Sequence, residues 1–428
     1  MIDPIVIWGA IAAFAAVGLV IAWRARAEMG AGAVDYYLGG GLGGLMSGLS
    51  YAATTYSAFM LVVLTGLTYR GGIGALGFEL IYFAGLSLVV LFGPRFWLVG
   101  RAHGFVSPAE MVGARYGSPA VARAMAGIGL LFLLPYCTTQ MAGIGLLLSG
   151  VTGGGIPLPA AVATGAGLAL VWTVVAGLRS VVWTDAVQAV VMLGSGLMAV
   201  GVAVQAIGGW GAFAAGLMAE NPAHLGVPGP GLWSFPTFLA LSFPWFFFAI
   251  SNPQVSQRLF MLRDLAALRR MILWVLGFGF VFTLVAVIWG FAALRLVPGL
   301  DNPAGATAAL LTSGAIPVWL AVALILGILS AAVSTLDSIA LTMGSMVARD
   351  LVPGQAEARQ ILIGRAVVIA VILFAAVFGV SKARIVDQLA ALSAAGLLVV
   401  VPPVVGAFFW PRATAAGALA DLVTRWVA

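Results

Sequence analysis

Eleven apolar stretches, each about as long as a bilayer-spanning helix, follow one another along the chain. They cover residues 4–23, 42–68, 74–99, 120–150, 157–178, 181–208, 232–256, 267–294, 315–346, 360–380 and 386–410. A bilayer offers no water to satisfy the backbone, so such stretches fold as helices. The pattern predicts an all-α polytopic membrane protein. We interpret residues 413–428 as the start of a further helix that is partial or truncated.

Composition agrees with this fold class. Of 428 residues, 62% are hydrophobic and 8% are charged, too few charges for a water-exposed surface of this size. The single cysteine, Cys137, excludes a disulfide framework and a cysteine-based metal cluster. No basic region precedes residues 4–23, so we expect a retained helix there, not a signal peptide.

Arginines give the predicted orientation. When the loops are assigned alternately to two sides, fifteen arginines fall on one side and four cationic residues, Arg70, Arg295, Lys382 and Arg384, on the other. The fifteen are Arg24, Arg26, Arg95, Arg101, Arg115, Arg123, Arg179, Arg258, Arg263, Arg269, Arg270, Arg349, Arg359, Arg365 and Arg412. Positive charge is retained on the cytoplasmic side, so the N-terminus is predicted to lie outside.

Two of the stretches have interrupted centres. Residues 40–69 carry hydroxyls at their middle, from Ser47 to Ser57, and residues 232–256 contain Pro244 and the polar break at 251–253. Apart from the first span, the other ten form two groups of five that start on opposite sides. We therefore predict an extra N-terminal helix (1–30) and inverted repeats at 40–210 and 230–412. Paired broken helices indicate a transporter's central site, although such residues also merely kink membrane helices.

The segment AAVSTLDS, residues 331–338, has ion-binding chemistry. Ala331, Ser334 and Thr335 are spaced i, i+3 and i+4, so they share one helix face. Two hydroxyls beside a carbonyl offer the neutral oxygens that suit a hard monovalent cation such as sodium. Alternatively, each hydroxyl simply bonds the carbonyl one turn earlier.

Several segments together carry a family resemblance. They are residues 50–66, RYGS at 115–118, WTDAVQ at 183–188, NPQVSQRLF at 252–260, AAVSTLDS at 331–338 and RDL at 349–351. In this order and spacing the chain resembles the sodium:solute symporter family, which includes sodium/proline, sodium/galactose and sodium/pantothenate symporters. The resemblance implies a LeuT-like core of five plus five inverted helices after one N-terminal helix. It also implies a sodium site formed by the carbonyls of Ala53, Tyr56 and Ala331 and the hydroxyls of Ser334 and Thr335.

Further roles follow from the same resemblance. Asp185 matches an aspartate near the cytoplasmic route of sodium, although pairing with Arg179 would give it a structural role. Asp337 is expected to be structural, and Glu79, near the start of its span, interfacial. The expected substrate-binding residues are Ser57, Tyr136, Gln140, Trp245, Ala249 and Asn252. Ala249 replaces a pocket aromatic of the proline carriers and Thr55 replaces their acid, so the sequence departs from the proline pattern.

We thus expect a sodium-coupled secondary active symporter that imports a small organic solute by alternating access. The solute is expected to be a monocarboxylate, amino acid, sugar or vitamin. A strongly charged solute is not expected, because no arginine or lysine lies deep in a predicted span to pair with an anion. The expected location is a prokaryotic cytoplasmic (inner) membrane, with the lipid bilayer and not nucleic acid as partner. A proton-coupled transporter and a non-transporting sensor are alternatives. A membrane enzyme would need a catalytic constellation, and a primary pump a GxxxxGK[ST] nucleotide loop.

Overall fold

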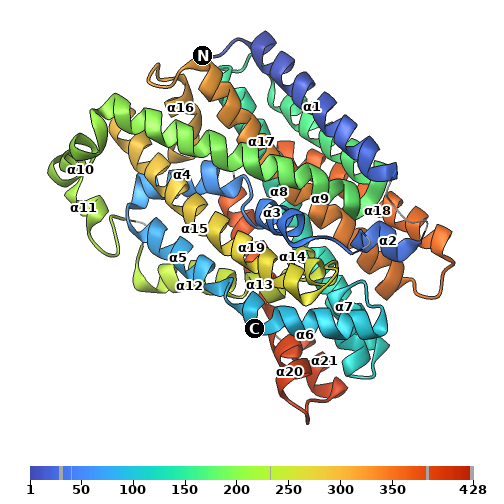
Figure 1. The fold of residues 1–428 in the computed structure, drawn as a ribbon. Helices are drawn as coiled ribbons and strands as arrows, with labels where there is room; N and C mark the ends of the chain where they lie inside the picture. The colour runs from blue at the N-terminus through green and yellow to red at the C-terminus, as the bar shows by residue number, and fades with distance from the viewer. Residues whose placement is uncertain (28–31, 40, 232, 382–384, 425–428) are drawn as a thin grey trace.

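The computed structural model describes residues 1–27, 32–39, 41–231, 233–381 and 385–424, and it is built of helices (Figure 1). In the first half these are α1 Pro4–Ala27, α2 Ala33–Leu38, α3 Gly44–Thr55, α4 Phe59–Gly71, α5 Gly74–Gly85, α6 Leu88–His103, α7 Pro108–Arg115, α8 Pro119–Val151, α9 Leu158–Ile207 and α10 Gly209–Glu220. In the second half they are α11 Pro222–Leu225, α12 Phe235–Phe246, α13 Phe248–Ser251, α14 Pro253–Ser256, α15 Leu265–Leu296, α16 Ala306–Thr312, α17 Val318–Met346, α18 Glu357–Ser381, α19 Val386–Leu397, α20 Val401–Phe409 and α21 Ala415–Thr424.

The predicted spans correspond to helices of the structure. Eight apolar helices among the described residues are long enough to cross a membrane, and the pair α3 and α4, bent by 45°, makes a ninth. Two further predicted spans match shorter apolar helices, Leu158–Val174 and Phe235–Phe246. The segment after residue 413 contains α21, a short helix of 10 residues.

The predicted loop between residues 178 and 181 is absent, because α9 runs through it. This helix has 50 residues, far more than the ~20 that cross a bilayer. Gly177 divides it with a φ of 57°, in the left-handed region that glycine adopts without penalty. Before Gly177, Trp172 packs on Phe14 of α1 with ring centroids 5.4 Å apart. After it, Ser195 lies against Gly327 of α17. The two spans therefore meet at one glycine.

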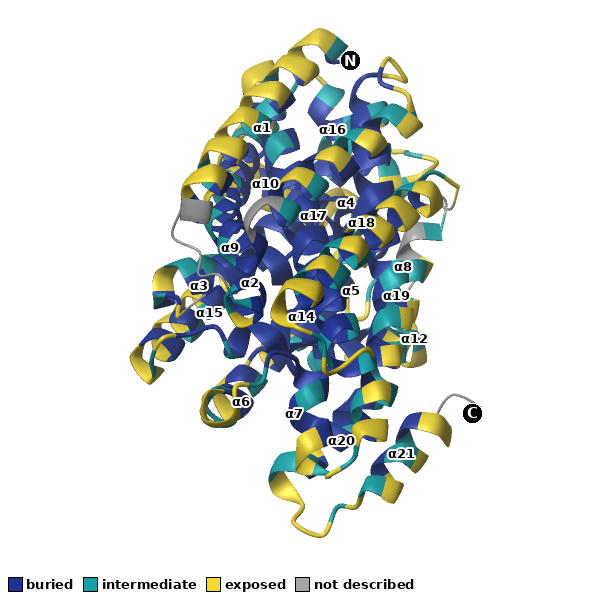
Figure 2. Ribbon diagram, turned by 90° about the vertical axis from the view of Figure 1, so that its right-hand side faces the viewer, coloured by how far each residue is buried: buried dark blue, intermediate teal, exposed yellow. Residues whose placement is uncertain are grey.

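Helix α17 is the axis of the molecule. All its residues from Gly327 to Met346 are buried, whereas α1 and α18 expose one side (Figure 2). A helix that is apolar on every side is stable only where others surround it. Its hydroxyl and carboxyl groups, including Ser334, Thr335 and Asp337, therefore lie inside protein and not against lipid.

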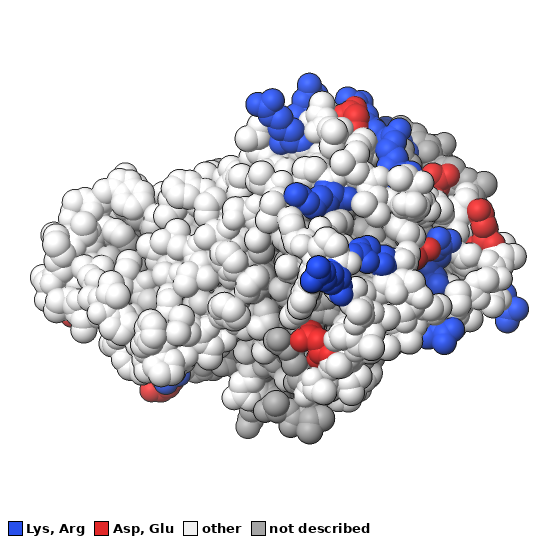
Figure 3. All heavy atoms as spheres, turned by 90° about the horizontal axis from the view of Figure 1, so that it is seen from below, with Lys and Arg blue, Asp and Glu red and all other residues white. Residues whose placement is uncertain are grey.

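Cationic side chains gather at one end of the molecule. Figure 3 shows them over one half of the face it views, while the other half is almost free of charge. Exposed arginines of the described residues include Arg101, Arg115, Arg123, Arg263 and Arg269. This asymmetry is the one used to predict orientation.

Candidate functional site

The break between α3 and α4 releases backbone carbonyls. Helix α3 ends at Thr55, and Tyr56 leaves helical geometry with φ −97° and ψ 88°. Helix α4 resumes at Phe59. The last carbonyls of any helix lack intrahelical partners and must find others. The helix predicted across residues 40–69 is thus interrupted at its hydroxyl-rich middle, between Thr55 and Phe59.

Hydroxyls of neighbouring helices bond these carbonyls one by one. Ser334 Oγ donates to Ala53 O at 2.9 Å, and Thr335 Oγ1 donates to Thr54 O at 3.2 Å. From α5, Tyr82 Oη donates to Thr55 O at 2.8 Å. Three successive carbonyls of the last turn of α3 therefore face side-chain oxygens. The participation of the Thr54 carbonyl was not predicted.

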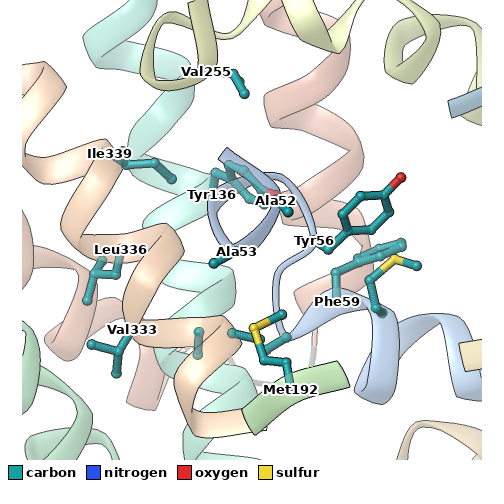
Figure 4. Close-up of a cluster of buried hydrophobic side chains, with 14 of the residues drawn as sticks. Ala52, Ala53, Tyr56, Phe59, Tyr136, Met192, Val255, Val333, Leu336 and Ile339 are labelled. Atoms are coloured by element: carbon teal, nitrogen blue, oxygen red, sulfur yellow. The ribbon is translucent and has the colours of Figure 1, made fainter. Parts of the chain in front are cut away.

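The same two hydroxyls also reach Ala331. Its carbonyl oxygen lies 3.2 Å from Ser334 Oγ and 2.9 Å from Thr335 Oγ1. The bonding one turn earlier, considered as an alternative, thus coexists with the bonds to α3. Figure 4 shows Ala53 directed towards α17, while the Tyr56 side chain points to the other side of the break. Neutral oxygens from both helices lie together, a donor set suited to sodium.

The Tyr56 ring is packed away from these oxygens. It contacts Tyr82 of α5 and Phe278 and Phe282 of α15, with centroid distances of 5.7, 5.9 and 6.1 Å. A Cβ atom at Gly279 would overlap the Tyr56 hydroxyl, so only glycine leaves room for the ring. The packing positions the backbone of the break; the role of the Tyr56 carbonyl as an ion ligand stays a prediction.

Asp185 forms a buried ion pair with Arg258, not with Arg179. Arg258 Nη2 lies 2.8 Å from Asp185 Oδ2, and both side chains are at most 1% exposed. Ser50 Oγ of α3 donates to the same carboxylate oxygen at 2.7 Å. Arg258 also bonds Ser338 Oγ of α17 at 2.6 Å. The pair is therefore held between α3, α9 and α17.

Arg258 is buried, unlike the exposed arginines of the basic side. It follows the broken segment α13–α14 in a short 3₁₀ turn, Gln257–Leu259, which carries it into the interior. Alternation of loops cannot show that a segment after a helix break turns inward.

The second broken helix lies where the sequence predicted it. Helix α13 ends at Ser251, Asn252 adopts φ −93° and ψ 111°, and Pro253 starts α14. Pro253 has no N–H, which suits the first position of a helix. The Asn252 side chain bonds Ser251 Oγ at 3.1 Å and Gln254 Nε2 at 3.3 Å. Its polar atoms thus stabilise the break itself.

Three of the six predicted substrate residues come together. Tyr136 Oη lies 3.5 Å from Ser57 Oγ, and the Tyr136 and Trp245 rings have centroids 6.2 Å apart. Gln140 follows one turn after Tyr136 on α8 and is fully buried, and neither of its amide atoms has a hydrogen-bond partner among the described residues. Ala249 is buried on α13. The structure thus joins Ser57, Tyr136 and Trp245 and places Asn252 in the break.

Comparisons with known proteins agree with this arrangement. The profile of the sodium:solute symporter family matches residues 36–424. The chain belongs to this family. It is a sodium-coupled symporter and not an enzyme, with sodium as its coupling ion.

Two relatives come from Bacillus subtilis (strain 168). The symporter is 25% identical over 400 residues to "Uncharacterized symporter YodF", covering 90% of this chain and 79% of that one. To "Uncharacterized symporter YhjB" it is 27% identical over 157 residues, or 36% of this chain and 32% of the relative.

Two solved structures share the fold. An outward-open, substrate-bound sodium-coupled sialic acid symporter matches with a TM-score of 0.82 and 18% identity, covering 97% of this chain and 88% of that one. Mhp1, a nucleobase-cation-symport-1 family transporter in a closed conformation with bromovinylhydantoin bound, matches with 0.55 and 15% identity, covering 86% and 79%. The LeuT-like architecture is confirmed.

Two carboxylates of the symporter lie deeper than a linear reading suggests. Glu79 was expected at the membrane interface, but it is 1% exposed, and α12 packs over its helix so closely that a Cβ atom at Gly85 would overlap the Phe246 carbonyl. Asp337 is fully buried on α17, where Asp185, Arg258 and Thr173 are its polar neighbours. Glu79 belongs to another part of the interior, described below.

Proposed function

We propose that the symporter imports a small organic solute with sodium by alternating access, and that sodium binds between α3 and α17. One observation carries the proposal: the carbonyls of Ala53 and Thr54 meet the hydroxyls of Ser334 and Thr335 at 2.9 and 3.2 Å. A bound cation would replace these hydrogen bonds. The carbonyls of Ala331 and Tyr56 complete the proposed ligand set.

Sodium at this place would hold the two helices together. Helix α3 contains the break and α17 is the buried axis, so an ion that both ligate favours the conformation in which they touch. Release to the cytoplasm follows when the helices part. In this proposal Asp185, whose Oδ1 has no hydrogen-bond partner among the described residues, attracts the departing ion. Ser57, Tyr136, Gln140, Trp245, Ala249 and Asn252 form the proposed solute site.

The driving force is the inward sodium gradient together with the membrane potential. Each elementary charge gains about 2.3 kcal/mol per 100 mV. The direction assumes that the arginine-rich end is cytoplasmic and the N-terminus outside, in a prokaryotic inner membrane. This chain has Ala249 and Thr55 where the proline carriers have a pocket aromatic and an acid, and this difference argues against proline as the solute.

Sodium-dependent stability of the purified full-length chain tests the site. Thermal unfolding is measured in sodium and in potassium for the wild type and for Ser334→Ala, Thr335→Ala and the double variant. An ion that is about a hundredfold above its dissociation constant adds about 2.7 kcal/mol. We expect this gain in the wild type and its loss in the double variant.

Ser330→Ala is the matched control. Ser330 is fully buried on α17 one turn earlier, and its hydroxyl bonds only Leu326 O within the helix, at 2.7 Å, in the described structure. It should keep the sodium response. Identical unfolding curves of the intact wild type in sodium and potassium would overturn the proposed site and favour the proton-coupled or sensor alternatives.

A further inference from the structure

Glu79 is buried, and no cationic side chain among the described residues pairs with its carboxylate. Its Oε2 atom has no hydrogen-bond partner among the described residues. The other buried carboxylates that the structure describes each have an arginine nearby, Arg258 for Asp185 and Asp337, and Arg349 for Asp350. A lone buried charge is costly unless something pairs with it.

Aromatic rings surround this part of the interior. Phe78 precedes Glu79, and Tyr82 follows three residues later on the same face of α5. Both flanking rings pack against Trp245, with ring centroids 6.3 and 5.5 Å away. The rings within 5.3–6.4 Å of one another form what we call the aromatic cage: Phe59, Phe78, Tyr82, Tyr136, Trp245 and Phe248.

The hydroxyls of the cage are already engaged. Tyr82 donates to Thr55 O, and Tyr136 to Ser57 Oγ. What the cage offers a solute is thus ring surface and one carboxylate. Sodium prefers several oxygens, and a polyhydroxylated solute needs many hydrogen-bond partners. An organic ammonium group suits this combination, because aromatic faces attract it and a carboxylate neutralises it.

We propose that the solute carries an amine, protonated or quaternary, which Glu79 binds inside the aromatic cage. The proposal rests on the proposed function, because it specifies the solute of that transport cycle. It selects amino acids and other amines among the expected solute classes. It also couples the two sites, since Tyr82 belongs to the cage and bonds the Thr55 carbonyl beside the ion ligands.

Isosteric pairs test the charge directly. Unfolding of the wild type in saturating sodium is measured with five ammonium compounds: methylammonium, tetramethylammonium, choline, glycine betaine and proline. Two uncharged compounds are the controls: inositol and 3,3-dimethylbutan-1-ol, which is the isostere of choline. We expect at least one ammonium compound to stabilise the protein while the isostere and inositol do not. Glu79→Gln should weaken ammonium binding by at least about thirtyfold and keep the sodium response. Glu220→Gln, at the exposed member of an ion pair with Arg295, should change neither.

The outcomes separate the two proposals. The amine proposal is overturned, and the sodium site stands, if sodium stabilises the wild type but no ammonium compound does. The same holds if 3,3-dimethylbutan-1-ol stabilises the protein as well as choline does, or if inositol stabilises it as well as the ammonium compounds do. Unaltered ammonium binding in Glu79→Gln also overturns it. If an ammonium compound stabilises the wild type and sodium does not, the amine site stands and the sodium site falls.

Discussion

The guanidinium of Arg258 lies 2.8 Å from the carboxylate of Asp185, and neither group is exposed to solvent. Ser50 of α3 and Ser338 of α17 complete the hydrogen bonds of the pair. A buried ion pair adds little net stability compared with apolar residues, but breaking it leaves a charge without compensation. Its two members should therefore respond together to substitution.

Arg258→Met and Asp185→Leu should each destabilise the symporter by about 3–5 kcal/mol, because each strands the opposite charge. The double variant should lose less than either single variant. Unfolding in detergent measures all three. Arg263→Met, at the exposed pair with Asp264, is the control and should leave stability essentially unchanged. Strictly additive losses in the double variant would contradict the pairing.

Gly177→Ala should destabilise the junction of the two spans in α9. Its φ of 57° costs an L-residue about 1–2 kcal/mol, and the added methyl would overlap the Tyr36 carbonyl. Gly167→Ala and Gly194→Ala, in the same helix, meet no atom within 4 Å and should leave stability unchanged. The three melting temperatures provide the comparison; equal values would show that the junction tolerates a side chain.

Gly279→Ala should weaken sodium binding although it leaves every proposed ligand residue unsubstituted. The methyl overlaps the Tyr56 hydroxyl, so the ring and the adjoining break must move, at about 1–3 kcal/mol for overpacking. Gly277→Ala, two residues away on α15 with nothing within 4 Å, is the matched control. Sodium titrations followed by thermal unfolding distinguish them. An unchanged sodium affinity in Gly279→Ala would mean that Tyr56 does not position the site.

Tyr82→Phe should lower stability by about 0.5–1.5 kcal/mol, because the Thr55 carbonyl loses its donor. The ring stays, so the aromatic cage keeps its shape, but the sodium response should diminish as the freed carbonyl shifts. Tyr69→Phe removes a similar bond, to Val297 O at 2.8 Å, and should lower stability while leaving the sodium response intact. Equal sodium responses in the two variants would count against the idea that Tyr82 positions the proposed ion ligands through the Thr55 carbonyl.

Local composition and spacing were enough to predict the helices, the interrupted α3–α4 pair and the shared helix face of Ser334 and Thr335. Those features depend on hydropathy, on hydroxyls at mid-span and on helical spacing. The approach of Ser334 to Ala53 followed from the family resemblance. The burial of Glu79 and Arg258 was not predicted, because burial depends on which distant segment packs outside a residue: α12 over α5 for Glu79, and the inward turn after α14 for Arg258. The loop predicted near residue 179 is absent because α9 continues through Gly177, a glycine in the left-handed region. The repeat boundaries and the ligand roles stay predictions.

The proposed ion ligands and the two serines that bond the Asp185–Arg258 pair occupy successive turns of the same two helices. Ser50 precedes Ala53 and Thr54 by about one turn of α3, and Ser338 follows Ser334 and Thr335 on α17; Thr54 Oγ1 and Ser338 Oγ join the two levels at 2.9 Å. Separating α3 from α17 would therefore withdraw Ser50 and Ser338 from the Asp185–Arg258 pair at the same time as it parts the proposed sodium ligands. The buried ion pair would lose its hydroxyl partners whenever sodium is released, so the solvation of the pair is tied to occupancy of the proposed ion site.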